Sequence, residues 1–405
     1  MRLFALILLA ASPLPATALE ITDWPLPAPP ASAQPNLARG ADGSLLLSWV
    51  ERRGDGHRLR FARHRGGDPA QGWDATRTIA EGDDWFVNWA DFPAMVELPG
   101  GTLWAHLLVR NRAATVAYDT RLFQSTDGGA RWTPRGPAHD DGTPTEHGFA
   151  TLWPAADATL GIAWLDGRHT GGGGHGHDHH GSGGAMTLRA ARFGDDGGKQ
   201  ADESLDASTC DCCQTDSAVD GDATLLVWRD RAEGEVRDIV VARHDTAGWH
   251  APVTVHADGW VMPACPVNGP AIAARAGHAW VAWYTAASGK PELRLAASTD
   301  GGRAFGKPRL LATGDAQQGR VDVAADASGV WTSWLQEDAA GQSLWLARYD
   351  ATLAREHFRA RVATVEGRGR GTGFPRLQVR DGTAWLAWTE VVDGQPRLRG
   401  IAVRP

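Results

Sequence analysis

The stretch that decides the fold reads Leu45-Leu46-Leu47-Ser48-Trp49 and continues, after a polar turn, with Leu59-Arg60-Phe61-Ala62-Arg63. Side chains alternate with a period of two in these runs, which is typical of β-strands and not of helices. Further copies of the pair of runs have their tryptophans at positions 164, 228, 283, 334 and 388, and a degenerate copy covers residues 104–109. The pattern therefore occurs in seven units.

The spacing of the units indicates how they assemble. From Trp164 onward, successive tryptophans are 51 to 64 residues apart, enough for four short strands with their turns. Four-stranded sheets repeated radially make an all-β β-propeller. We expect seven blades, with six as the alternative. The last unit stops one strand short at Val403, so residues 20–27 are expected to supply its outer strand and close the ring.

Two turn motifs point to a known group of propellers. Residues 125–132 (STDGGARW) and 298–305 (STDGGRAF) match the Asp-box pattern S-x-D-x-G-x-x-[WF]. Its aspartate accepts hydrogen bonds from turn amides, and its glycine adopts a conformation that other residues resist. The chain resembles the sialidase-like propellers with BNR repeats over most of its length, which implies the propeller fold.

The resemblance also implies what a sialidase site would contain. That family uses three arginines for the substrate carboxylate, a tyrosine nucleophile paired with a glutamate, and an acid/base aspartate. The [FY]-R-I-P motif that carries the first arginine does not occur in this sequence, and the only tyrosines are Tyr118, Tyr284 and Tyr349. The resemblance therefore supports the propeller fold more than it supports the sialidase reaction.

The net charge and the targeting signals indicate where the protein is located and which partners it could have. The net charge is -8, and no basic stripe exists, so nucleic acid is not expected as a partner. Residues 1–18 have Arg2, a short apolar core and Ala16-Thr17-Ala18, as in a cleaved signal peptide. We expect residues 19–405 to form a single propeller domain that is periplasmic or secreted, with no membrane span.

The repeat predicts where a functional site would form. The segments that lead into the innermost strands converge on the central funnel. Counting back about 12 to 18 residues from each tryptophan gives these segments. They contain Asn88–Asp91, Glu146-His147, Cys210–Cys213, Cys265–Asn268, Arg320 and Arg376. Cys212 and Cys265 are one repeat apart, so all four cysteines are expected to meet at neighbouring blades.

The cysteines allow three interpretations. Two disulfides would be usual in an exported protein. A soft-metal site is the sharper hypothesis, because thiolates favour copper(I) or zinc. Its ligands would be Cys210, Cys212, Cys213 and Cys265, with His147 as a further candidate. A redox-active thiol pair is the third possibility.

A glycine-rich insertion over 171–184 adds four histidines. His175, His177, His179 and His180 lie in it, on the face where the inner strands begin. A flexible tether of this kind can capture a metal ion but cannot fix its geometry. The alternative is a low-complexity insertion without a role.

Charged residues of the funnel support a second function class. Asp91, Glu146, Arg320 and Arg376 could bind and cleave an anionic sugar, with arginines holding a carboxylate and the acids moving protons. They could equally be paired charges of a water-filled funnel. We favour an exported sialidase-like propeller that binds copper, or zinc, through the Cys/His cluster. The alternative is an exo-glycosidase or a propeller that binds a small glycan ligand.

Overall fold

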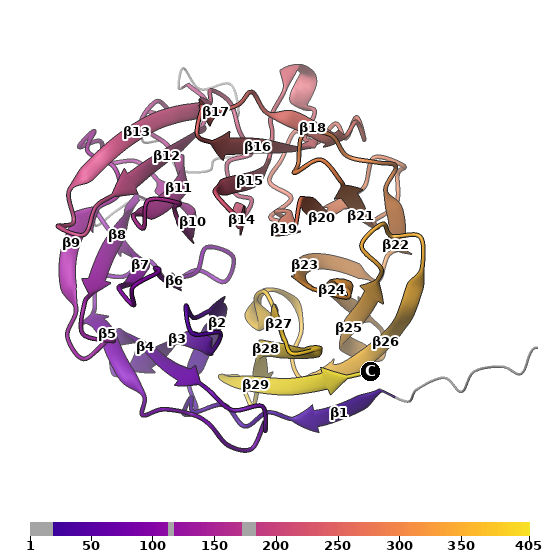
Figure 1. Ribbon diagram of the computed structural model, residues 1–405, viewed down its shortest axis with the longest axis horizontal. Coiled ribbons are helices and arrows are strands. Elements are labelled where there is room, and N and C mark those ends of the chain that lie inside the picture. Colours follow the sequence, from indigo (N-terminus) through magenta and orange to yellow (C-terminus); the bar gives the residue numbers. More distant parts are fainter. Residues whose placement is uncertain (1–18, 112–116, 172–183) are drawn as a thin grey trace, which may run out of the picture.

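The computed structural model describes residues 19–111, 117–171 and 184–405, which form seven antiparallel sheets around one axis. The sheets are arranged like blades, and β2, β6, β10, β14, β19, β23 and β27 surround the centre (Figure 1). The predicted seven-bladed all-β propeller is confirmed, and the six-bladed alternative is wrong. In the described residues the only helices are two short 3-10 turns, η1 (Glu233–Glu235) and η2 (Gly369–Thr372).

The first three blades run from the innermost strand outward. Blade 1 consists of β2 (Ser32–Arg39), β3 (Leu45–Arg53), β4 (Gly56–His64) and β5 (Arg77–Gly82). Blade 2 consists of β6 (Ala94–Glu97), β7 (Leu103–Arg110), β8 (Tyr118–Ser125) and β9 (Thr133–Pro137). Blade 3 consists of β10 (His147–Pro154), β11 (Leu160–Asp166), β12 (Thr187–Phe193) and β13 (Lys199–Asp206).

Blades 4 to 6 follow the same order. Blade 4 consists of β14 (Asp216–Asp220), β15 (Ala223–Arg229), β16 (Ile239–Asp245) and an outer strand split into β17 (Gly248–Trp249) and β18 (Val253–His256). Blade 5 consists of β19 (Ala271–Arg275), β20 (His278–Thr285), β21 (Glu292–Ser298) and β22 (Arg309–Thr313). Blade 6 consists of β23 (Gln317–Asp326), β24 (Gly329–Asp338), β25 (Gly341–Tyr349) and β26 (Glu356–Val365).

Blade 7 closes the ring with both ends of the described chain. It consists of β27 (Arg376–Arg380), β28 (Thr383–Val392), β29 (Gln395–Arg404) and, as its outer strand, β1 (Glu20–Asp23). Glu20 pairs with Arg404 and Asp23 with Ile401, and Figure 1 shows β1 beside β29. The predicted closure by the N-terminal segment is confirmed. This pairing gives blade 7 its fourth strand and joins the two ends of the described chain in one sheet.

The repeated tryptophans form the core between blades. Each lies in the second strand of its blade, and Trp49, Trp164, Trp283 and Trp334 have no exposed surface. A buried indole contributes a large apolar area, and its N–H needs a partner. In blade 3, Trp164 Nε1 donates to Asp166 Oδ2 at 2.8 Å. The sequence repeat therefore reflects the packing of one sheet on the next.

The two STDGG turns join the third and fourth strands of blades 2 and 5. In the second turn, the Asp300 carboxylate accepts from Arg303 N and Ala304 N, both at 3.0 Å, and from Ser298 Oγ at 2.7 Å. Because antiparallel strands alternate in direction, these turns lie on the face opposite the segments that lead into the inner strands. These inner-strand connections form what we call the upper face.

The predicted signal peptide, residues 1–18, lies outside the described residues. Among the residues that the structure describes, no helix has the length and apolar character needed to cross a membrane.

Candidate functional site

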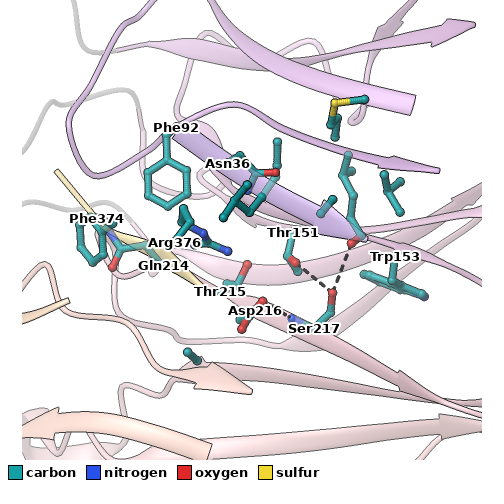
Figure 2. A pocket seen from close by; sticks show the side chains of 18 of the residues that line it. Asn36, Phe92, Thr151, Trp153, Gln214, Thr215, Asp216, Ser217, Phe374 and Arg376 are labelled. Carbon is teal, nitrogen blue, oxygen red and sulfur yellow. Dashed lines mark hydrogen bonds between the residues drawn. The ribbon is translucent and has the colours of Figure 1, made fainter. Parts of the chain in front are cut away.

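A cavity of about 300 Å³ runs along the propeller axis and is lined by all seven inner strands. Figure 2 shows Phe92, Phe374, Gln214 and Arg376 at one end of it and Trp153 at the other. Asp216 of β14 and Arg376 of β27 bring charge into this cavity. Burial raises the pKa of Asp216 to about 7, with Arg376 opposing the shift.

Aromatic side chains close the cavity at the upper face. The loop between β5 and β6 brings Trp89 and Phe92 against Phe374, with ring centroids 5.7 Å apart in each pair. Gln214 Nε2 donates to the carbonyl of Ala90 at 2.7 Å and fixes this loop to blade 4. We call Trp89, Ala90, Phe92, Gln214 and Phe374 the plug.

All four cysteines pack in the same apolar cluster as the plug, where the connections that lead into blades 4 and 5 meet; we call this place the junction of blades 4 and 5. Cys210, Cys212 and Cys213 lie in the connection from β13 to β14, and Cys265 lies in the connection from β18 to β19. The sulfurs of the first three lie within 4.8 Å of one another, and the Cys212 thiol also contacts the Cys265 thiol. The repeat spacing therefore correctly predicted that Cys212 and Cys265 lie together.

The four cysteines are thiols in the structure. All of them lie in the described part of the chain, and none forms a disulfide there. Three of the four are buried, and Cys265 is partly exposed. Cys210 Sγ lies 2.9 Å from Cys213 Sγ. Four convergent thiols from two neighbouring blades are a ligand set suited to a soft metal ion.

Two buried guanidinium groups give the thiol cluster a positive environment. Arg229 is 1% exposed, and its nitrogens donate to the carbonyls of Asn268, Tyr284 and Arg237 at 2.7–3.1 Å. Within the described residues, no carboxylate pairs with it, so its charge faces Cys213. Arg237 lies near Cys210; its Nη2 pairs with Glu235 Oε2 at 2.6 Å, and its Nε and Nη1 have no hydrogen-bond partner in the described residues. Both arginines favour negative charge on sulfur.

The thiols differ in how readily they ionise. Burial raises the pKa of Cys213, but thiol hydrogen bonds from Cys210 and Cys212, the Arg229 charge and the Asn268 amide outweigh burial and bring that pKa well below its usual value. Hydrogen bonds with the other three thiols, together with burial, raise the pKa of Cys212. Burial raises the pKa of Cys210 to about 12. A bound metal ion would favour the thiolate form of all four sulfurs.

The backbone around the thiols is under local constraint. A Cβ on Gly269 would lie 2.2 Å from the Gln214 carbonyl oxygen, so only glycine lets the segments that lead into β14 and β19 approach this closely. Val267 has a φ of +50°, a value that β-branched residues rarely adopt. Such outliers concentrate at functional sites, and this one lies two residues after Cys265.

The acids predicted for catalysis lie together beneath the plug loop. Asp91 is 2% exposed and accepts from Tyr118 Oη at 3.0 Å and from Phe149 N at 2.9 Å. Glu146 bridges to Tyr118 through the backbone and lies close enough to act on Asp91 electrostatically. Burial raises the pKa of Asp91 to about 7. Burial, Asp91 and Glu146 raise the pKa of the Tyr118 hydroxyl.

The two predicted arginines are not part of this acidic group. Arg320 is 5% exposed; its Nη1 donates to Thr372 Oγ1 and Gly373 O at 2.9 Å, and its Nη2 donates to Gly369 O at 2.8 Å. Its guanidinium also stacks over Trp89 at 4.9 Å. Arg376 lies in the axial cavity, 3.4 Å from Asp322. Arg320 fixes the η2 loop, whereas Arg376 and Asp91 both line the axial cavity, so the structure brings two of the four charged residues to that cavity.

His147, one of the histidines predicted as metal ligands, is not grouped with the thiols. His147 Nε2 lies 3.1 Å from Asp141 Oδ2, and its ring stacks on His139. Its possible ligand partners are aspartates and His139, so adding His147 to the thiol set is not supported by the geometry. His175, His177, His179 and His180 lie outside the described residues.

Sequence reasoning missed the residues that surround the predicted sites. Tyr118 starts a third strand and carried no motif, and Arg229 and Arg237 lie in and after β15, away from the inner-strand connections. One signal was present for Arg229, because it follows the repeat tryptophan Trp228 directly. A charged residue at that step of an otherwise apolar buried strand needs a partner.

Comparisons with known proteins extend the description of the fold. No family model matches the sequence, and no curated protein matches it. Among solved structures, the polysaccharide lyase Uly1 is similar with a TM-score of 0.54 and 10% identity, over 92% of this chain and 90% of that chain. The endosialidase of phage phi92 has a TM-score of 0.51 and 10% identity, over 95% of this chain and 69% of that chain.

A third solved structure is that of the GH93 α-L-arabinofuranosidase of Fusarium graminearum. It has a TM-score of 0.47 and 12% identity, over 95% of this chain and 97% of that chain. Identities this low concern the fold and not the chemistry. The chain is a seven-bladed propeller with the fold of sialidase-like and related propeller enzymes.

Proposed function

We propose that this protein is an exported propeller that binds a soft metal ion through Cys210, Cys212, Cys213 and Cys265. Copper(I) is our first candidate and zinc the alternative. The observation that carries the proposal is the convergence of four thiols, without a disulfide, on two buried guanidinium groups. Thiolate ligands select these two ions over magnesium, calcium or manganese.

The surroundings of the thiols support binding over catalysis at this position. The plug covers the cluster, and Cys265 is the one thiol with partial exposure, so an ion would reach the site past Cys265. Positive charge from Arg229 and Arg237 would offset the excess negative charge of several thiolates around one ion. The four histidines of 171–184 lie outside the described residues, and their part in gathering metal stays a prediction from the sequence. Export is supported by the signal-peptide pattern of residues 1–18.

The test is metal analysis of protein purified without chelator from a periplasmic extract, with thiol counting on the same sample. We expect about one copper or zinc ion per chain, released together with four titratable thiols on unfolding. Competition with a copper(I) chelator and with a zinc chelator decides between the two ions. Phe149→Leu is the control, because Phe149 packs in the same apolar cluster and carries no ligand atom. A metal-free protein with two disulfides would contradict the proposal.

A second candidate function rests on Tyr118, Asp91 and Glu146. A tyrosine hydroxyl bonded to an aspartate beside a glutamate provides the residue types that the sialidase resemblance implies. The similar solved structures include a polysaccharide lyase and an endosialidase, which is a reason to test glycans as ligands. Arg320 and Arg376 have other partners, and Asp91 and Tyr118 are buried, so a substrate would first have to displace the plug loop. The test is hydrolysis of a fluorogenic sialoside. Turnover that Tyr118→Phe abolishes would establish this function.

A further inference from the structure

The four thiols differ in how far solvent can reach them. Cys210, Cys212 and Cys213 are 1%, 7% and 2% exposed, whereas Cys265 is partly exposed. Val261, in the same connection as Cys265, is 61% exposed, so this connection forms part of the molecular surface. A reagent that approaches from solvent therefore meets the Cys265 side chain before the other three thiols.

Contacts between the sulfurs decide which thiol can act together with Cys265. The Cys212 thiol contacts the Cys265 thiol, and the two residues belong to separate connections. Cys210 Sγ lies 2.9 Å from Cys213 Sγ, but both residues are buried in the apolar cluster. Cys212 and Cys213 are adjacent, and adjacent Cα atoms lie about 3.8 Å apart, below the usual range for a disulfide. Cys212 and Cys265 are therefore the pair that can react together from the solvent side.

The chain around Cys265 is anchored on both sides. The amide of Met262 donates to a carbonyl of the connection between β15 and β16 at 2.9 Å, and the Asn268 carboxamide oxygen accepts from an amide of β23 at 3.0 Å. Between these anchors, Pro263 and Pro266 have no amide hydrogen to donate. The anchors hold Cys265 at the thiol cluster, and the prolines leave the segment between them with fewer backbone hydrogen bonds to resist a small movement.

We propose that Cys265 is a modification site that exchanges with a low-molecular-weight disulfide, and that Cys212 resolves the product into a Cys212–Cys265 disulfide. Thiol–disulfide exchange requires a sulfur that the reagent can reach and a second thiol in contact with it, and these two residues meet both conditions. The product would link the connections that lead into blades 4 and 5. This activity goes beyond metal binding and does not depend on it.

The exchange proceeds in two displacements. Cys265 gives its proton to water, and its sulfur attacks the external disulfide, whose S–S bond breaks and releases one thiolate. Cys212 then gives up its proton and attacks Cys265 Sγ, which breaks the bond to the reagent's other half and releases a second thiolate. Each released thiolate takes up one of the two protons. Two protein thiols are thereby oxidised to one disulfide, and one external disulfide is reduced to two thiols.

The disulfide would also compete with a bound metal ion. It uses the sulfurs of Cys212 and Cys265, which are two of the four proposed ligands, and a metal ligand must be a thiolate. Oxidation should therefore release the ion. This consequence rests on the proposed function, whereas the exchange itself does not.

The test treats reduced, metal-free, full-length protein with an equimolar amount of bis(2-hydroxyethyl) disulfide and maps its peptides without reduction. We expect a peptide pair joined through Cys212 and Cys265, with Cys210 and Cys213 still present as thiols. Cys212→Ser should instead retain one half of the reagent on Cys265, because the resolving thiol is missing. Cys265→Ser should lose both the adduct and the disulfide. Phe149→Leu, the control that packs in the same cluster without a sulfur, should react like the unsubstituted protein.

A first adduct on Cys210 or Cys213 would overturn the proposal, as would a Cys210–Cys213 disulfide in place of the expected one. Cys212→Ser protein without an adduct on Cys265 would also overturn it. The map of the unsubstituted protein does not depend on any variant folding.

The same treatment of metal-loaded protein separates this proposal from the proposed function. We expect release of about one ion for each Cys212–Cys265 disulfide formed. A disulfide that forms without release of the ion would contradict the proposed ligand set and leave the exchange established. A missing disulfide in the metal-free protein would overturn the exchange and leave the metal site standing.

Discussion

The junction of blades 4 and 5 and the junction of blades 2 and 3 occupy equivalent steps of the propeller but carry opposite charge. At the first, Arg229 and Arg237 surround thiols, and Arg229 has carbonyl partners only. At the second, the buried Asp91 and the partly buried Asp141 are held by hydroxyl, amide and imidazole donors. The comparison teaches that one scaffold can present a thiol cluster lined by arginines and a cluster lined by acids at the same level of the ring.

The largest effect is expected when one thiol at the junction of blades 4 and 5 is removed. Cys212→Ser or Cys265→Ser should each lower copper(I) affinity by about 1,000-fold, since one missing thiolate dismantles the ligand set. The double variant should be little worse than either single one, because coupled residues do not add. Competition titration measures this. Single variants with unchanged affinity would show that the junction of blades 4 and 5 is not a metal site.

The second prediction tests the charge at the thiol junction. Arg229→Met should destabilise the fold by about 3 kcal/mol, because buried carbonyls lose their donors, and should also weaken metal binding. Arg320→Met is the matched control, since Arg320 is equally buried and also donates to carbonyls, but at the plug. It should cost similar stability in urea unfolding and leave affinity nearly unchanged. Equal losses of affinity would argue against a specific role for Arg229.

The third prediction concerns Asp91 and pH. Its pKa of about 7 in the folded protein lies above the ordinary value of 3.8, so the folded state keeps a proton that the unfolded state has lost. Stability should therefore fall as pH rises from 5 to 7, by about 2 kcal/mol, and level off above pH 7. Asp91→Asn should remove the part of this slope that Asp91 contributes, about 2 kcal/mol between pH 5 and 7, and leave the part due to Asp216, whose pKa is also about 7, in denaturant unfolding at several pH values. An unchanged slope would place the titrating group elsewhere.

The smallest effect is expected on the face away from both junctions. Asp300→Ala removes three hydrogen bonds of an exposed turn between β21 and β22, so stability should fall by about 1 kcal/mol. Metal content and affinity should stay the same. Thermal unfolding and metal analysis of one sample check both statements. Loss of metal without loss of stability would mean that the two faces are interchanged.

Most of the fold could be predicted because a propeller repeats its packing. Trp164, Trp228 and Trp283 recur at the same step, and a missing strand after Val403 required the segment at Glu20 to complete blade 7. The position of the thiols followed from the same period. These features depend on where a residue falls in the repeat, which the sequence displays directly.

The partners of the site residues could not be predicted in this way. His147 and Arg320 lie where the repeat places them, yet Asp141 and the η2 loop decide what they contact. Those partners come from connections of irregular length, which have no period. The buried guanidinium of Arg229 was also missed, because the alternation of a buried strand says nothing about which carbonyls meet its side chain.

X-ray absorption at the copper and zinc edges, on protein isolated under its native redox conditions, tests the central claim most directly. The account predicts about one ion per chain with sulfur neighbours at about 2.3 Å, bound by cysteines that are not joined in disulfides. A spectrum without any sulfur-bound metal, from protein whose four cysteines are joined in disulfides, would contradict the account.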